Sequence, residues 1–278
     1  MPAPRLQPAA PAGSPGVAVG QASPSAPPVT VKRSRWWVEA LLIVWLAWVY
    51  DATTNLAPLR VHAALAHARS ILHLEQSLGL DPERSLDHWL AGHHTLALVV
   101  SDYYDNAHFI VTFGLLGWLW WARADIYRPL RNILVLTNVI AFVVFWRFPV
   151  APPRMLGGFT DVVASSGAIG SWHGHSGLAS HANELAALPS LHIAWASWCT
   201  LAVWQATRRV WARALATAYP FVTTFAVLST GNHFLMDVLA GLLLFAVSVA
   251  LVWILEALRE RRRKTRSRAP AKALAQAP

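Results

Sequence analysis

Two histidines at the edges of long apolar runs carry most of the chemical signal in this sequence. One is His192, and the other is His233, which precedes Asp237 by four positions. Residues four apart lie on one face of a helix, so the Asp237 carboxylate can hold one ring nitrogen of His233 while the other stays free to attack. We therefore predict that His233 is a nucleophile oriented by Asp237, and that His192 is a general acid.

Two arginines upstream predict that the group under attack is a phosphate. Arg147 and Arg154 are seven positions apart, and Arg154 follows two prolines that fix where its side chain emerges. A guanidinium matches a phosphate bidentately and stays charged, and the Ser190 hydroxyl can donate to the same oxygens. The sequence thus predicts Arg147, Arg154 and Ser190 as phosphate ligands. Since the arginines supply the positive charge, no metal and no cofactor is expected.

The composition predicts that helices in a membrane position these residues. The chain is 55% hydrophobic and 13% charged, whereas soluble domains carry about 25% charged residues. Six apolar runs approach the roughly 20 residues that a helix needs to cross a bilayer, and alternation at period two is absent. The expected fold is an all-α membrane protein, a bundle of six transmembrane helices over 36–57, 95–121, 130–148, 190–207, 211–230 and 234–255.

The segments between and beyond these runs divide the chain further. We predict an amphipathic interfacial helix over 61–80, after span one, and a long outer loop over 149–187, between spans three and four. Residues 1–35 are rich in Pro, Ala, Gly and Ser, and are expected to form a disordered cytoplasmic tail. Residues 36–255 would then be the catalytic membrane domain, and 256–278 a basic cytoplasmic tail.

The distribution of cations predicts the orientation of the bundle. With the N-terminus inside, the cytoplasmic flanks hold eighteen of the 23 Lys and Arg residues, as the positive-inside rule requires. Both termini are then cytoplasmic, and the predicted site is extracytoplasmic, at what we expect to be the plasma membrane of a bacterium. Most of the net charge of +9 lies in the C-terminal tail. Membrane lipids are therefore the expected partners, and nucleic acid is not.

Two of the segments resemble signatures of the phosphatidic acid phosphatase type 2 superfamily. Its first signature is Lys-x6-Arg-Pro, and Arg147-x6-Arg154 keeps the spacing with Arg for Lys and Met155 for Pro. Its second is Pro-Ser-Gly-His, which Pro189–His192 keeps with Leu for Gly. The resemblance implies a six-helix bundle and the histidine roles given above.

The third signature, Ser-Arg-x5-His-x3-Asp, is kept only in its core. His233-x3-Asp237 matches it, but Ala226-Val227 stand where the family has Ser-Arg. These departures resemble the inositol phosphorylceramide synthase-like (inositolphosphotransferase) branch, which has Phe-Pro-x-Ala-Pro-Pro and Pro-Ser-Leu-His segments. The resemblance implies a lipid phosphate or phosphodiester substrate and leaves water and an alcohol open as acceptors.

Several other residues allow more than one interpretation. Asn183 is a candidate for shaping the pocket, and Tyr103 and His108 either line a substrate entrance or form a hydrogen-bonded seam between helices. His173 and His175 in the outer loop could bind a metal, although few acids and no cysteine lie nearby. A non-catalytic transporter or scaffold is the alternative function, and it would distribute polar residues through the depth of the spans.

Overall fold

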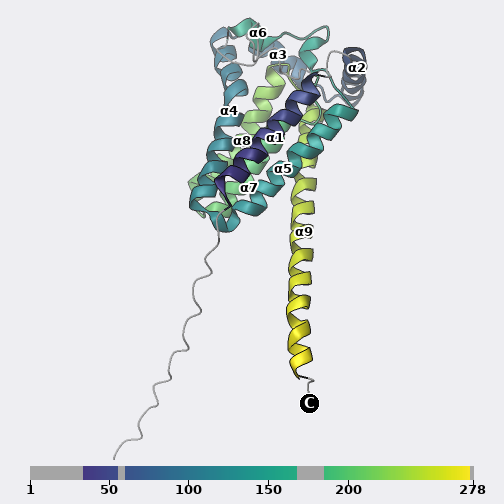
Figure 1. The fold of residues 1–278 in the computed structure, drawn as a ribbon. Coiled ribbons are helices and arrows are strands. Elements are labelled where there is room, and N and C mark those ends of the chain that lie inside the picture. The colour runs from purple at the N-terminus through teal and green to yellow at the C-terminus, as the bar shows by residue number, and fades with distance from the viewer. Residues whose placement is uncertain (1–33, 56–59, 168–184, 276–278) are drawn as a thin grey trace, which may run out of the picture. The chain divides into compact units, whose positions relative to one another are not determined.

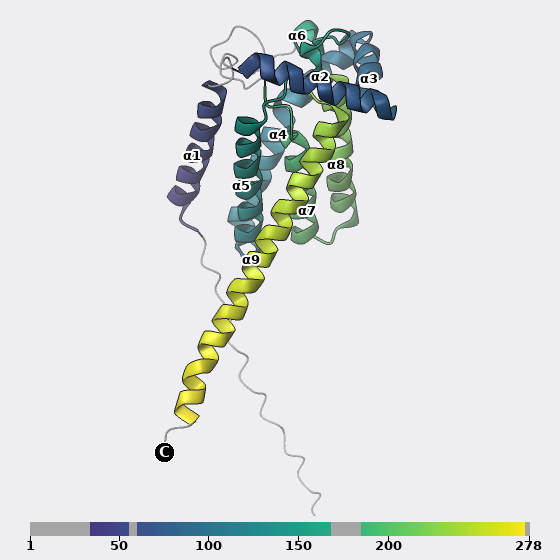
Figure 2. The ribbon, with the colours of Figure 1, turned by 90° about the vertical axis from the view of Figure 1, so that its right-hand side faces the viewer.

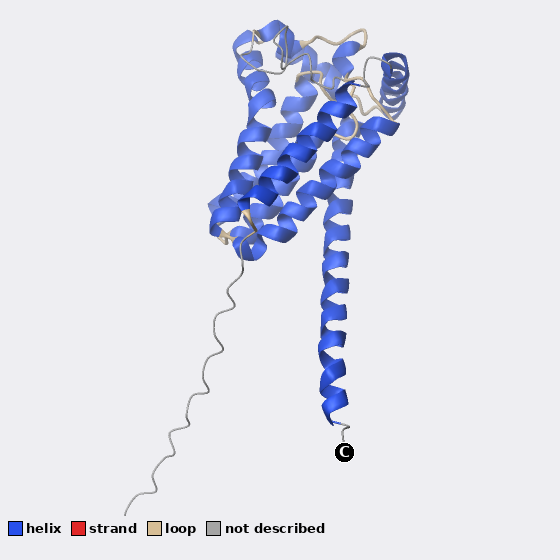
Figure 3. Ribbon diagram, viewed as in Figure 1, coloured by secondary structure: helices blue, strands red, loops and turns tan. Residues whose placement is uncertain are grey.

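All regular structure in the described part of the chain is helical. The computed structural model describes residues 34–55, 60–167 and 185–275, and its elements are drawn in Figure 3. Three expectations lie outside these residues: the disorder of 1–33, the place of Asn183, and the metal alternative at His173 and His175. The prediction of an all-α fold is confirmed for the described residues.

A helix covers each of the six apolar runs. These helices are α1 (Trp36–Asn55), α4 (His94–Ala122), α5 (Ala124–Arg147), α7 (Leu191–Ala206), α8 (Val210–Ser229) and α9 (Leu235–Ala275). The last helix continues past the expected end of its span into the basic segment. The amphipathic helix is also present, as α2 (Val61–Leu78). Three short elements were not predicted from the sequence, namely α3 (Pro82–Ala91), α6 (Val162–Ser166) and the 3-10 turn η2 (Pro153–Met155).

Two of these helices are long and apolar enough to cross a membrane, judged by length and composition. They are α5 and the Leu235–Thr265 part of α9. The helix α7 has only 16 residues, and α4 carries Asp102, Asp105 and His108 in its middle turns. These polar turns lower the hydropathy of α4. The six-span topology therefore stays a prediction.

The centre of the bundle is α7, which packs against α4, α5, α8 and α9. Its Trp198 is fully buried and donates its indole N–H to the Leu130 carbonyl at 2.8 Å. Leu119 and Val252 belong to the same apolar cluster. On the outside of the bundle, the Glu39 carboxylate ties α1 to α5 by accepting from Tyr127 (2.8 Å) and Arg131 (2.6 Å).

The short helices gather at one end of the bundle. Figures 1 and 2 show α2, α3 and α6 at the end of the bundle where α7 and α9 begin and α8 ends, away from the far end of α9. The helix α2 stops at Gly79, whose left-handed φ of 65° lets the chain turn back into α3. We call α2, this turn and α3 the α2–α3 hairpin. It lies beside the segments that carry the predicted site.

Candidate active site

The end of α8 sets the position of His233. Gly231 adopts φ 64°, its N–H donates to Leu228 O, and the Asn232 N–H donates to Val227 O. This is the Schellman arrangement that ends many helices, and it favours glycine at the left-handed position. The next N–H, that of His233, also donates to Val227 O at 3.1 Å. The backbone of the predicted nucleophile is therefore fixed by the helix end before it.

The start of α9 holds the imidazole. Asp237 lies in the first turn, and its Oδ2 accepts from the Phe234 N–H at 2.9 Å and lies 3.3 Å from His233 Nδ1. Asp237 is fully buried and His233 is 4% exposed. With the Nδ1 proton donated to the carboxylate, the lone pair of Nε2 is available for attack. The structure thus brings together the two residues that the four-residue spacing paired.

The start of α7 packs directly against the same turn of α9. The Ser190 N–H donates to Asp237 O at 3.0 Å. A Cβ at Gly241 would lie 2.5 Å from the Ser190 carbonyl oxygen, so only glycine allows this approach of α9 to α7. The contact places the His192 ring 5.5 Å from the His233 ring, between centroids. The Ser190 hydroxyl is buried and has no hydrogen-bond partner among the described residues.

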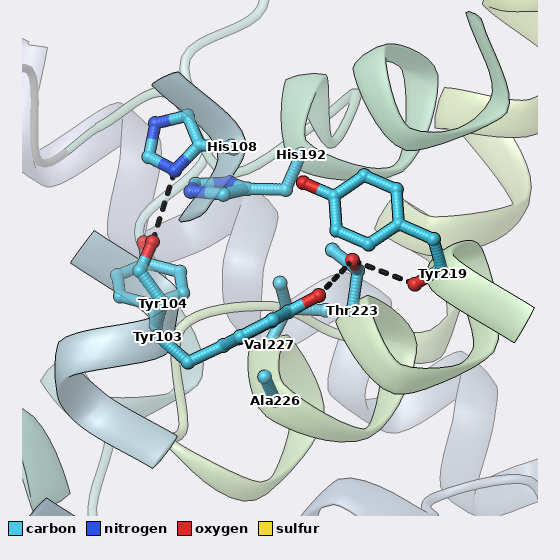
Figure 4. A pocket seen from close by; sticks show the side chains of 8 residues that line it. All are labelled: Tyr103, Tyr104, His108, His192, Tyr219, Thr223, Ala226 and Val227. Atoms are coloured by element: carbon cyan, nitrogen blue, oxygen red, sulfur yellow. Dashed lines mark hydrogen bonds between the residues drawn. The ribbon is translucent and has the colours of Figure 1, made fainter. Parts of the chain in front are cut away.

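Aromatic side chains of α4 surround His192. Tyr104 stacks on its ring at 4.5 Å, and His108 meets it edge-on at 4.2 Å. A narrow crevice adjoins these rings, and Figure 4 shows the side chains that line it. The other lining residues are Tyr103, Tyr219, Thr223, Ala226 and Val227. Tyr103 both lines this crevice and donates or accepts a 2.8 Å hydrogen bond with Thr223 of α8, so it fits both interpretations made from the sequence.

Arg154 reaches the loop that carries His233. Its backbone N–H donates to Gly231 O at 2.8 Å, and its guanidinium donates to the Asn232 side chain. The same guanidinium lies 3.4 Å from Asp161 Oδ2, and the Arg154 side chain is only 8% exposed. The predicted phosphate ligand Arg154 is thus a buried cation beside Asn232, the neighbour of the predicted nucleophile.

Arg147 lies in different surroundings. It ends α5, its side chain is exposed, and its guanidinium lies 4.9 Å from the centre of the Trp146 ring. The structure joins Arg154, His192, His233, Asp237 and Ser190 around one end of the bundle, whereas no contact between Arg147 and these residues is found within the described chain. A role of Arg147 in phosphate binding stays a prediction.

Three buried acids lie next to the site and were not predicted from the sequence. Glu75 and Glu83 of the α2–α3 hairpin and Asp87 of the same hairpin are all fully buried. Asp87 Oδ1 accepts from the Thr160 N–H at 2.9 Å, and its other oxygen lies near Gly231. On an amphipathic segment such residues look like the polar face of an interfacial helix. The one available signal was the clustering of acids around the turn at Gly79.

Comparison with protein families agrees with this geometry. The family model of the PAP2 superfamily matches residues 69–251, about two thirds of the 278-residue chain. The matched stretch includes all the residues predicted for catalysis and phosphate binding. No curated protein and no solved structure matches the chain.

Proposed function

Since the chain belongs to the PAP2 superfamily, whose enzymes act on phosphate esters as phosphatases or phosphotransferases, we propose that it transfers a phosphoryl group from a membrane lipid through a phosphohistidine at His233. The observation that carries this proposal is the 3.3 Å contact between His233 Nδ1 and the buried Asp237 carboxylate, with the His192 ring 5.5 Å away. This is the arrangement of a nucleophile, its orienting group and an acid.

In the first step, Nε2 of His233 attacks phosphorus, and the bond from phosphorus to the lipid alkoxide oxygen breaks. His192 gives its proton to that oxygen, so the alcohol leaves neutral. Asp237 keeps the Nδ1 proton in its hydrogen bond and stabilises the positive charge that develops on the ring. Arg154 and the Ser190 hydroxyl bind the phosphoryl oxygens, whose charge grows in the transition state.

In the second step, an acceptor hydroxyl attacks the phosphohistidine. His192, now neutral, takes the proton of that hydroxyl, and the bond between phosphorus and Nε2 breaks. Water as acceptor releases phosphate or a phosphomonoester, and an alcohol gives a new phosphodiester or monoester. His192 recovers its proton and His233 its lone pair, so both histidines return to their starting states.

The crevice beside His192 supports a phosphodiester substrate and an alcohol acceptor, as in the inositolphosphotransferase-like branch. Its lining contains three tyrosines and a threonine but no arginine or lysine. Val227 lines it at the position where the family's third signature has arginine. A phosphodiester carries less charge than a monoester and needs fewer cations. The absence of arginine and lysine from this lining therefore favours a phosphodiester over a monoester.

The experiment that tests the reaction uses the purified full-length protein in detergent. It is incubated with a panel of lipid phosphates and phosphodiesters, with and without added alcohols, and the products are identified. We expect His233→Ala to lower turnover by about 10³-fold or more, because the nucleophile is lost. Orthovanadate should inhibit as a mimic of five-coordinate phosphorus, and a chelator should not. Full turnover by purified His233→Ala would refute the nucleophile assignment.

A second experiment tests the proposed extracytoplasmic location. Cys199 is the one cysteine of the chain and is 2% exposed, so it gives little background for thiol labelling. We expect Ser165→Cys, exposed in α6 near the site, to react with an impermeant reagent in intact cells. Arg208→Cys, exposed between α7 and α8, should react only after the cells are opened. The reverse pattern would invert the topology.

A further inference from the structure

The first turn of α9 takes its cap from another helix. Phe234 precedes the helix and has no side-chain acceptor, although a helix start leaves several N–H groups without a partner inside the helix. Asp237 accepts from the Phe234 N–H, and Glu75 Oε1 accepts from the Met236 N–H at 2.6 Å. Glu75 belongs to α2, 161 positions earlier. The α2–α3 hairpin therefore caps the turn that carries the orienting carboxylate of Asp237.

The capping carboxyl has a second buried carboxyl as its neighbour. Glu75 of α2 and Glu83 of α3 are both fully buried, and the charge of Glu83 acts on Glu75. The second oxygen of Glu75 and both oxygens of Glu83 meet no N–H or hydroxyl donor in the described residues. Two ionised carboxylates buried together without a compensating donor are costly, so we expect one of them to hold a proton. We call Glu75 and Glu83 the acid pair.

The surroundings of the acid pair favour keeping that proton. The charged groups that act on it from the hairpin and from α9 are Asp81 and Asp237, and both are acidic. Burial raises the pKa of the Glu75 carboxyl to about 9, and the neighbouring Glu83 adds to this rise. Burial also raises the pKa of Glu83. A Glu75 carboxyl that keeps its proton at neutral pH still has a carbonyl oxygen, which accepts from the Met236 N–H.

We propose that Glu75 is a positioning residue that holds the first turn of α9 through its hydrogen bond with the Met236 N–H and so keeps the Asp237 carboxylate against His233. Glu75 fixes the backbone of Met236, which is the residue next to Asp237. Because the contact between Asp237 and His233 is already 3.3 Å long, a small displacement of this turn would break it. The effect of this positioning on catalysis rests on the proposed function. The expectation that the acid pair holds a proton is independent of that function.

The proton also predicts how stability depends on pH. In the unfolded chain Glu75 ionises near pH 4.5, and in the folded chain it ionises near pH 9. Between these values the folded state binds a proton that the unfolded state has lost, so stability falls as pH rises through this window. Glutamine is the neutral counterpart of protonated glutamate: its oxygen can accept from Met236, and its amide can donate to Glu83.

The test compares the wild type with Glu75→Gln, Glu75→Ala and the control Gln76→Ala, which changes the exposed neighbour of Glu75. Thermal unfolding in detergent is measured from pH 5 to pH 9, and kcat and KM are measured from pH 6 to pH 10. We expect the melting temperature of the wild type to fall across this range, and that of Glu75→Gln to fall less. We expect Glu75→Ala to lose roughly 5- to 30-fold in kcat at pH 7, the equivalent of a lost cap, with KM little changed.

The conservative variant separates positioning from bulk structure. Glu75→Gln should retain kcat at pH 7 within about threefold, as expected when hydrogen bonds are kept, and lose the part of the alkaline decline in kcat that centres near pH 9. Gln76→Ala should match the wild type in every measurement. If Glu75→Gln shows the same pH dependence of melting as the wild type, or loses as much kcat as Glu75→Ala, the positioning proposal is wrong.

The two proposals can fail separately in this experiment. A wild type that turns over no phosphate ester overturns the proposed function, and the melting curves still decide whether the acid pair holds a proton. An active wild type with an equally active Glu75→Ala overturns the positioning role and leaves the proposed function standing.

Discussion

The two sides of His233 are built in different ways. On the motif side, Ser190, His192 and Asp237 come from helix starts, and the key hydrogen bond spans four residues. On the hairpin side, Glu75 and Asp87 reach across the molecule to backbone N–H groups of Met236 and Thr160. The motif side holds the groups that we propose to meet the substrate, and the hairpin side holds the backbone that carries them. The proposed chemistry is thus encoded locally, while its support depends on contacts distant in sequence.

The strongest way to test the motif side is Asp237→Asn. The asparagine keeps an oxygen for the Phe234 N–H but cannot stabilise a positive charge on His233, and its amide can favour the wrong tautomer. We expect kcat to fall by about 10²–10⁴-fold, as for the orienting acid of a catalytic triad. The measurement is steady-state turnover of the best substrate from the panel, with melting temperature as the control for folding. A loss below about tenfold, smaller than the ~10²–10⁴-fold typical of general acid–base catalysis, would mean that Asp237 only caps α9.

The next largest effect on turnover is expected from Arg154→Ala, and Arg147→Ala provides the comparison within the same signature. Arg154 is buried beside the His233 loop, whereas Arg147 is exposed on Trp146. We expect Arg154→Ala to reduce kcat/KM by about 10–100-fold, the value of one or two charge-assisted hydrogen bonds. Arg147→Ala should change it by less than about threefold, as is usual for an exposed cation.

Equal losses in Arg147→Ala and Arg154→Ala would contradict the arrangement of this site. They would show that Arg147 joins the phosphate site when substrate is bound, as the family signature predicts. Melting temperatures of both variants are needed beside the kinetics, because Arg154 also forms an ion pair with Asp161.

Sequence patterns predicted the long helices and the pairing of His233 with Asp237 for a physical reason. Apolar runs report burial directly, and a spacing of four reports a shared helix face, so His233 and Asp237 could be paired without a fold. Arg147 and Arg154 could not be told apart, because their spacing says nothing of the Gly231 carbonyl that binds only the Arg154 N–H. The helix α3 was not predicted because it has only ten residues, few of them apolar, and so shows no long apolar run.

The acids of the hairpin side could not have been found in the same way. Glu75 lies on an amphipathic helix, where a carboxylate is expected to face water. Its burial depends on the turn at Gly79 and on the start of α9, 161 positions later. A pattern read over a few residues carries no information on such a contact. The buried acid is visible only once the hairpin is placed against the bundle.

The interface between α7 and α9 tests whether the motif side depends on close backbone approach. A methyl group at Gly241 would lie 2.5 Å from the Ser190 carbonyl oxygen, so Gly241→Ala must push the two helices apart. We expect a loss of about 1–3 kcal/mol of stability, the usual cost of overpacking, and a fall in kcat of about tenfold as His192 moves away from His233. Gly117→Ala in α4, where a Cβ meets nothing within 4 Å, is the matched control for thermal unfolding and turnover.

The smallest effect is expected on the hairpin side, from Asp87→Asn. Burial raises the pKa of the Asp87 carboxyl, so its charged form is costly in the folded state. An asparagine oxygen can still accept from the Thr160 N–H, and the variant removes the buried charge. We therefore expect kcat within about threefold of the wild type, since the hydrogen bond is kept, and a melting temperature that is higher than that of the wild type at pH 8 but not at pH 4. The pH 8 gain follows because a group with a raised pKa weakens the folded state as pH rises. A large loss of kcat in Asp87→Asn would show that the charge itself acts on the site, and the division between a chemical side and a supporting side would no longer hold.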